Sequence, residues 1–166
     1  MSQSILDTRP GGLLRLGLRG PIWLFRLHLD PLLGDRFLLL IHTGRKSRLP
    51  RQTVIEVVQH DGTSDTYYVV SGWGEKSDWY RNIRQTPQVT VCVGGRKFQA
   101  YAEFISTEKA IGILETYARE HPTAFRELSG LFLGERLQPG SDAPGRLAQK
   151  MPMVAFHPGQ SKDQRS

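Results

Sequence analysis

The spacing of apolar residues changes near residue 35, and the two sides of this point predict different structures. Residues 12–33 are rich in Leu, Ile, Trp and Phe but are interrupted by three arginines and two prolines. This pattern predicts one or two amphipathic helices within an N-terminal segment, residues 1–34. Packing on the domain's own core, contact with a membrane surface and a dimer contact all remain open for this segment. No run of about 18 uncharged apolar residues occurs, so we expect no membrane-spanning helix.

Beyond residue 35 the pattern is that of a sheet. Continuous apolar runs and β-branched alternation between glycines and turn residues are typical of strands. Asp61-Gly62 and Gly94-Gly95 have the composition of tight turns between neighbouring strands. The strands we expect cover residues 36–43, 52–60, 66–71, 88–93, 96–105 and 153–156.

Helical spacing returns in three places. Ser77 or Asp78 is a suitable N-cap for a short helix that Pro87 stops, and Thr107 is a suitable N-cap for the next helix. Stretches rich in Pro, Gly, Ser and Asp, or in polar residues alone, predict irregular structure. We expect helices over 79–85, 108–120 and 123–133, a loop over 138–146, and a disordered tail over 158–166.

Strands joined by short turns favour antiparallel pairing, with helices at the ends and at two insertions. The predicted class is therefore α+β, a small barrel or curled sheet of mainly antiparallel strands. At 166 residues with 39% hydrophobic composition, we expect a single domain over residues 1–166.

The charge of the chain narrows the classes of partner. A net charge of +6 favours nucleic acid, anionic lipid, or a phosphorylated or carboxylated small molecule. One cysteine excludes an internal disulfide and is consistent with the cytoplasm. The five histidines are scattered without metal-ligand spacing, so we expect no metal site. His42, inside an apolar strand, is expected to be a satisfied core or groove histidine.

The strongest local signal is a basic stretch over residues 43–51, between two predicted strands. It offers four cations, a hydroxyl and a glycine that permits positive φ, so its backbone N–H groups can curl around an anion. A solvated basic turn is the alternative interpretation. Neither a Walker loop nor a dinucleotide fingerprint is present. The candidate anion ligands are Arg45, Lys46, Ser47 and Arg51, with Arg48 beside them.

A second cluster covers residues 71–82. Two glycines flank a tryptophan after a strand, a place where a flat ring can meet the backbone, and a helix N-terminus follows. The spacing of Trp79 and Ile83 favours a place in the core over a cofactor contact, and Asn82 can brace a loop or contact a ligand. The candidate residues are Ser71, Gly72, Trp73, Gly74, Trp79 and Asn82.

Together the two clusters resemble the deazaflavin-dependent nitroreductase family, relatives of the flavin-binding split β-barrels. The resemblance is close over residues 36–105 and looser to residue 156. Its motifs are TGRKS-x-x-PR and DWYRN-x-x-x-x-P-x-V, in this order and spacing.

This resemblance implies a split β-barrel that binds coenzyme F420 and transfers a hydride from the reduced cofactor to a small conjugated acceptor such as a quinone or enone. The resemblance implies that the cofactor's phosphate is bound by Arg45, Lys46, Ser47 and Arg51. It implies that the deazaflavin ring lies along the stretch Ser71, Gly72, Trp73 and Gly74. Trp79 and Asn82 match the helix that closes this loop. The basic composition suits the coenzyme's phosphodiester and oligoglutamate tail. Ser71 is the candidate hydrogen-bond partner of the substrate.

Two departures from the family concern the substrate side. Nitroreductase members typically carry a lysine after the strand-end serine, where this chain has Gly72 in a shorter loop. They also carry tyrosines in a C-terminal helix, whereas residues 123–133 contain Phe125 and Phe132 but no tyrosine. We therefore do not assign nitroimidazole as the substrate.

Other interpretations stay open. A related barrel can bind FMN, haem or another tetrapyrrole, and a cofactor-binding protein without activity is a further alternative. Nucleic-acid binding is not expected, since the cations lie in a turn rather than along a sheet face. We expect a cytoplasmic protein, with peripheral membrane contact through residues 12–33 and a homodimer as open alternatives.

Overall fold

The computed structural model describes residue 31 and residues 34–135 and 142–159. The expected N-terminal helices and the tail beyond residue 159 lie outside the described residues. The strands are β1 (Phe37–Thr43), β2 (Pro50–Asp61), β3 (Thr66–Val70), β4 (Gln88–Val93), β5 (Arg96–Phe104) and β6 (Met153–Pro158). The helices are a short 3₁₀ helix η3 (Gly74–Lys76), α2 (Asp78–Gln85), α3 (Thr107–Glu120), α4 (Pro122–Leu133) and α5 (Ala143–Lys150).

The strands form one closed barrel in the order β1-β2-β3-β6-β5-β4, with every neighbouring pair antiparallel. Closure is made between β1 and β4, where Leu39 faces Cys92 and Ile41 faces Thr90. The last strand, β6, is inserted between β3 and β5. The predicted α+β class and antiparallel barrel are confirmed.

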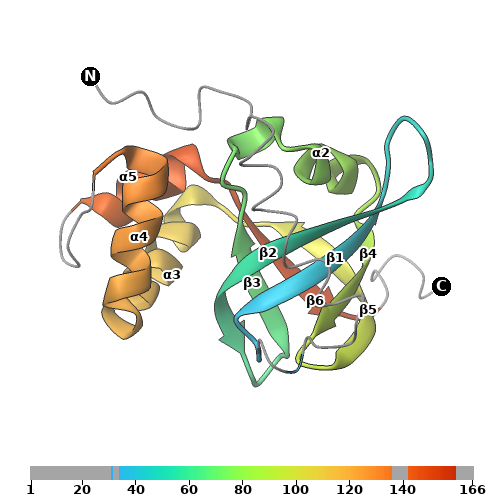
Figure 1. Cartoon of the computed structure of the whole chain (residues 1–166), viewed down its shortest axis with the longest axis horizontal. Helices are drawn as coiled ribbons and strands as arrows, with labels where there is room; N and C mark the ends of the chain where they lie inside the picture. The colour runs from blue at the N-terminus through green and yellow to red at the C-terminus, as the bar shows by residue number, and fades with distance from the viewer. Residues whose placement is uncertain (1–30, 32–33, 136–141, 160–166) are drawn as a thin grey trace.

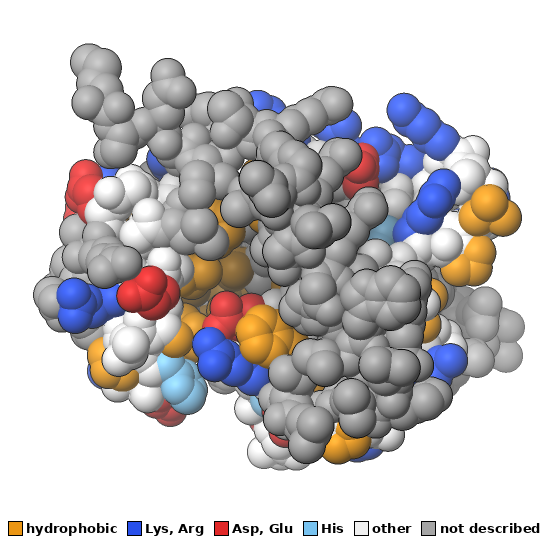
Figure 2. All heavy atoms as spheres, in the orientation of Figure 1, with side chains coloured by type: hydrophobic (Ala, Val, Ile, Leu, Met, Phe, Trp, Pro, Cys, Tyr) orange, Lys and Arg blue, Asp and Glu red, His pale blue; other side chains and the backbone are white. Residues whose placement is uncertain are grey.

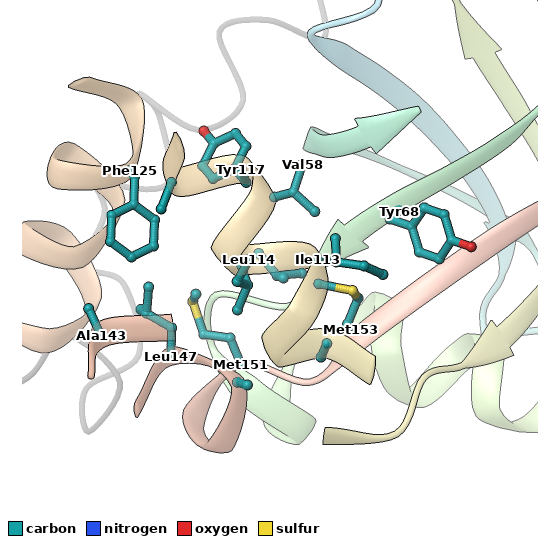
Figure 3. Packing of buried hydrophobic residues seen from close by; sticks show 14 of the residues in the cluster. Val58, Tyr68, Ile113, Leu114, Tyr117, Phe125, Ala143, Leu147, Met151 and Met153 are labelled. Atoms are coloured by element: carbon teal, nitrogen blue, oxygen red, sulfur yellow. The ribbon is translucent and has the colours of Figure 1, made fainter. Parts of the chain in front are cut away.

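Figure 1 shows α3, α4 and α5 grouped on one side of the barrel, while α2 lies across one end beside the β1–β2 loop. Two apolar clusters hold these layers together. One fills the barrel and includes Leu38, Leu40, Val69, Ile83, Val91 and Phe156. The other joins the three helices to β2, β3 and β6 through side chains such as Val58, Leu114, Phe125, Leu147, Met151 and Met153 (Figure 3).

Two local predictions were wrong. Part of the expected loop over 138–146 is the start of α5, because Pro144 occupies the first turn of a helix, where its missing N–H is harmless. Residues 138–141 lie outside the described part. The N-cap of α3 is Ser106 rather than Thr107, since Ser106 Oγ accepts from the Lys109 N–H at 3.3 Å. In the described part of the chain, no helix is long and apolar enough to cross a membrane.

Candidate functional site

The two clusters singled out in the sequence meet at the end of the barrel that α2 covers. The β1–β2 loop projects beside α2, and the turn after β3 leads through η3 into that helix (Figure 1). The sequence-predicted residues therefore come from three neighbouring segments of the chain: the loop, the turn and the helix.

A buried side-chain network ties the loop to α2. Asn82, 4% exposed, is its centre, and its Oδ1 accepts from the backbone N–H of Arg45 at 3.1 Å and from Arg45 Nη1 at 2.9 Å. Arg45 Nη2 also pairs with Asp78 Oδ1 at 3.1 Å. On the other side, Asn82 Nδ2 lies 3.1 Å from His42 Nδ1. The guanidinium of Arg45 is thus engaged inside the protein.

The protonation state of His42 follows from this network. Asn82 Oδ1 receives the protons of Arg45, so the Nδ2 amide must be the donor and His42 Nδ1 the acceptor. Burial, followed by the charge of Arg51, lowers the pKa of His42 to about 4, with Asp78 opposing this shift. His42 is therefore neutral near pH 7, with its proton on Nε2.

The β1–β2 loop is a closed turn that needs a glycine. The Gly44 N–H donates to the Leu49 carbonyl at 2.9 Å, and the Arg48 N–H donates to the Gly44 carbonyl at 2.8 Å. A Cβ at residue 44 would lie 2.6 Å from Ser47 Oγ and 3.3 Å from the Leu49 carbonyl oxygen, so the glycine lets these groups approach the backbone closely. Arg48 takes φ of 58°, so the chain reverses sharply here.

The remaining cations of the loop face solvent. Ser47 Oγ accepts from Arg51 Nη2 and from the Leu49 N–H, each at 3.3 Å, and Arg48 Nη1 donates to Thr86 Oγ1 at 3.2 Å. Within the described residues, Lys46 has no hydrogen-bond or ion-pair partner. Figure 2 shows Lys and Arg side chains gathered where this loop projects. This arrangement can bind an anion by Lys46, Ser47 and Arg51.

Ser71 closes the turn that follows β3. Its side chain is fully buried; Oγ donates to the Gly74 carbonyl at 2.7 Å and lies 2.8 Å from Ser77 Oγ. Its backbone N–H donates to the Pro152 carbonyl at 2.9 Å. The hydroxyl is therefore directed into the turn, and Ser77, the residue before α2, makes no side-chain cap of that helix.

The helical layer contacts this turn through Phe132. A Cβ on Gly72 would lie 2.4 Å from Phe132 Cζ, so the glycine lets the ring lie against the backbone. The rings of Trp73 and Phe132 meet edge to face, with centroids 6.0 Å apart and an interplanar angle of 87°. The half-buried Trp79 instead packs against the barrel core and meets Tyr80 at 6.0 Å.

His42 and Phe132 are the members of this site that the sequence did not assign to it. His42 was expected to be a satisfied core or groove histidine, and the structure shows that Asn82 satisfies it. The sequence feature that could have assigned His42 to the site is its place as a polar residue in an apolar strand, directly before the basic loop. Phe132 had only the weaker signal of an aromatic residue near the end of a predicted helix.

Comparison with known proteins agrees with this architecture. An F420-H2 dependent reductase (FDR-A) superposes with a TM-score of 0.50 at 20% identity, covering 75% of this chain and 96% of that one. A conserved hypothetical protein from Mycobacterium tuberculosis gives 0.52 at 14% identity, covering 82% and 80%. A putative pyridoxamine 5'-phosphate oxidase from Listeria innocua gives 0.50 at 16% identity, covering 82% and 93%. At these identities the likeness is one of fold.

Sequence comparison gives the family. No curated protein matches the chain. The family model described as F420H(2)-dependent quinone reductase matches residues 27–130, more than half of the chain. This match covers both motifs and the barrel strands β1 to β5. The chain therefore belongs to the F420H(2)-dependent quinone reductase family, and it is an oxidoreductase that uses coenzyme F420.

Proposed function

We propose that the β1–β2 loop holds the phosphate of coenzyme F420 through Lys46, Ser47 and Arg51, and that the chain reduces a quinone. The observation that carries this assignment is that the cations of the loop differ in their contacts and exposure. Arg45 is bound to Asn82 and Asp78, whereas Lys46 and Arg51 remain exposed beside a hydroxyl. Arg45 shapes the loop and Arg48 contacts Thr86, whereas Lys46 and Arg51 are available to an anion.

The described residues fit an anionic cofactor at this place. A closed turn with exposed cations offers both charge and N–H donors, and the coenzyme carries a phosphodiester. Lys46 supplies a point charge, while the Arg51 fork and Ser47 Oγ, already 3.3 Å apart, supply directed hydrogen bonds. Asp78, which lies beside the loop, is paired with Arg45.

For the ring, we propose the turn from Gly72 to Gly74 together with Trp79. Ser71 and Asn82 then act as positioning residues, because both are buried and hydrogen-bonded within the protein. Ser71 fixes the turn, and Asn82 fixes the loop relative to α2. This replaces the expectation that Ser71 hydrogen-bonds the substrate.

The acceptor we propose is a quinone, the class named in the description of the matching family. When bound, reduced F420 supplies a hydride, and a quinone that takes this hydride and one proton becomes a hydroquinone while the coenzyme is left oxidised. The protein's part is to hold the two rings in contact and to exclude water. The half-buried Trp73 and the buried Phe132 provide an apolar wall for a flat acceptor.

Equilibrium titration with F420 tests the phosphate assignment. Lys46→Ala and Arg51→Ala should each weaken F420 binding by about 10-fold, because each removes a charged group from an exposed phosphate site. Lys97→Ala is the matched control. It removes the charge of an exposed lysine on the β4–β5 hairpin and should leave the affinity for F420 unchanged. Equal affinities for all three variants would contradict the assignment, and tighter binding of FMN than of F420 would replace the cofactor.

We also propose that the chain forms a homodimer in the cytoplasm. A solved structure with TM-score 0.50 and 19% identity is a domain-swapped dimer. Sedimentation velocity at micromolar concentration should show twice the monomer mass, and a single 18.8 kDa species would contradict this. Membrane contact through residues 12–33 falls on residues outside the described part and stays an expectation from the sequence.

A further inference from the structure

The indole of Trp73 carries a buried hydrogen-bond donor without a protein partner. Its Nε1 is inaccessible to solvent, and it accounts for all unpaired buried side-chain N and O atoms in the described part of the chain. An N–H removed from water without an acceptor costs free energy, so native proteins rarely keep one without a reason. A ligand oxygen that reaches this atom would recover that cost.

The position of this donor is well defined. Trp73 lies in the turn between Ser71 and Gly74, which hydrogen bonds close on both sides. Its ring is held edge to face by Phe132, at the last turn of α4. Without a ligand, the only interaction that the described residues leave open to this N–H near Phe132 is a weak N–H···π contact with that ring.

The chemistry of quinone reduction calls for such a donor. As a quinone receives a hydride, negative charge develops on its carbonyl oxygen, and a fixed N–H in an apolar setting stabilises that charge. An unpaired donor has no protein hydrogen bond to break before it does so. The indole N–H is too weak an acid to transfer its proton, so the proton that completes the hydroquinone comes from solvent.

We propose that the Trp73 indole N–H donates a hydrogen bond to the carbonyl oxygen of the quinone, beside the Phe132 ring. This inference rests on the proposed function and adds the residue that recognises the acceptor. It also explains why residue 72 is glycine, since the small residue lets Phe132 and Trp73 meet over the turn.

Indole N–H signals in ¹H–¹⁵N spectra test the contact directly. The chain has three tryptophans, and the signal absent from Trp73→Phe identifies the one of interest. With oxidised F420 bound, where no reduction occurs, 1,4-naphthoquinone should move the Trp73 signal downfield. Naphthalene, which has the same ring shape without carbonyl oxygens, should not. Equal effects of the two compounds, or no effect of either, would overturn the proposal.

Kinetics of Trp73→Phe provide the second measurement. The variant keeps an aromatic ring but lacks the donor, so kcat/KM for 1,4-naphthoquinone should fall roughly 10- to 100-fold. This kcat/KM is measured at saturating reduced F420, because Trp73 also lies in the turn proposed to hold the cofactor ring and its replacement can change the Kd for F420. An unchanged kcat/KM for the quinone under these conditions would overturn the role. Absence of F420 binding by the unaltered protein would instead refute the proposed function. If Trp73→Phe does not fold, Trp23→Phe and Trp79→Phe identify the Trp73 signal by elimination, and its shift in the unaltered protein decides.

Discussion

Replacing Asn82 by leucine should lower the free energy of unfolding by about 3 kcal/mol and weaken F420 binding about 10-fold. The leucine fills the buried volume but cannot pair with its neighbours. The Arg45 backbone N–H, its guanidinium and His42 Nδ1 would each lose their partner at Asn82. The weaker binding follows because the loop that carries Lys46 and Arg51 is no longer held against α2.

Urea unfolding and F420 titration of the same preparations measure the two effects. Gln85→Ala is the matched control, because Gln85 is exposed on the same helix and its loss should change stability by less than about 0.5 kcal/mol. A loss below about 1 kcal/mol for Asn82→Leu would show that the network adds little to stability. Unchanged F420 affinity would show that the loop does not depend on it.

Acidification should destabilise the protein through His42. Its pKa is about 4 in the folded protein and about 6.5 in the unfolded chain. Between these values the unfolded chain binds more protons, so the free energy of unfolding falls as the pH falls from 6.5 to 4, by up to about 3 kcal/mol. Urea unfolding at closely spaced pH values gives this slope.

The variant His42→Gln isolates this effect. It removes the titrating ring, so the slope between pH 6.5 and 4 should become shallow. Asp65 does not contribute to this slope. Its hydrogen bond with Arg96 lowers its pKa to about 2, so the stability that this interaction adds is lost only below pH 4. An equally steep slope in the variant would assign the acid sensitivity to other groups.

The fold could be predicted from the sequence because its strands alternate strongly and its turns are short. Each expected strand is present with ends shifted by a few residues, such as β2, which runs from Pro50 to Asp61 instead of 52–60. Strand order could not be predicted, since placing β6 between β3 and β5 is a long-range choice that local patterns do not encode. The α5 helix was missed because Pro144 and Gly145 are typical of loops, although Ala143, Leu147 and Ala148 form a buried helical stripe.

The two clusters predicted from the sequence lie next to each other in the structure, but the roles of individual side chains were not predictable. Composition gave four equivalent cations in the loop, and only the structure shows that Arg45 faces inward to Asn82. For Ser71, the strand pattern predicted a place at the end of the third strand but not the direction of its hydroxyl. The orientation of Arg45 depends on Asn82, which lies 37 residues away in the sequence. The orientation of Ser71 depends on how the turn to Gly74 and Ser77 folds, which local patterns do not encode.

The placement of β6 has a consequence for the order in which the protein acquires its shape during synthesis. Both motifs, within residues 43–89, leave the ribosome well before residues 153–158, yet β3 and β5 have unpaired edges until β6 arrives. A nascent chain therefore holds all the proposed F420 contacts in its sequence while the barrel that orders them is still open. We therefore expect the cofactor to bind only after β6 has paired. Until then the unpaired edges of β3 and β5 are the part of the chain most prone to aggregation.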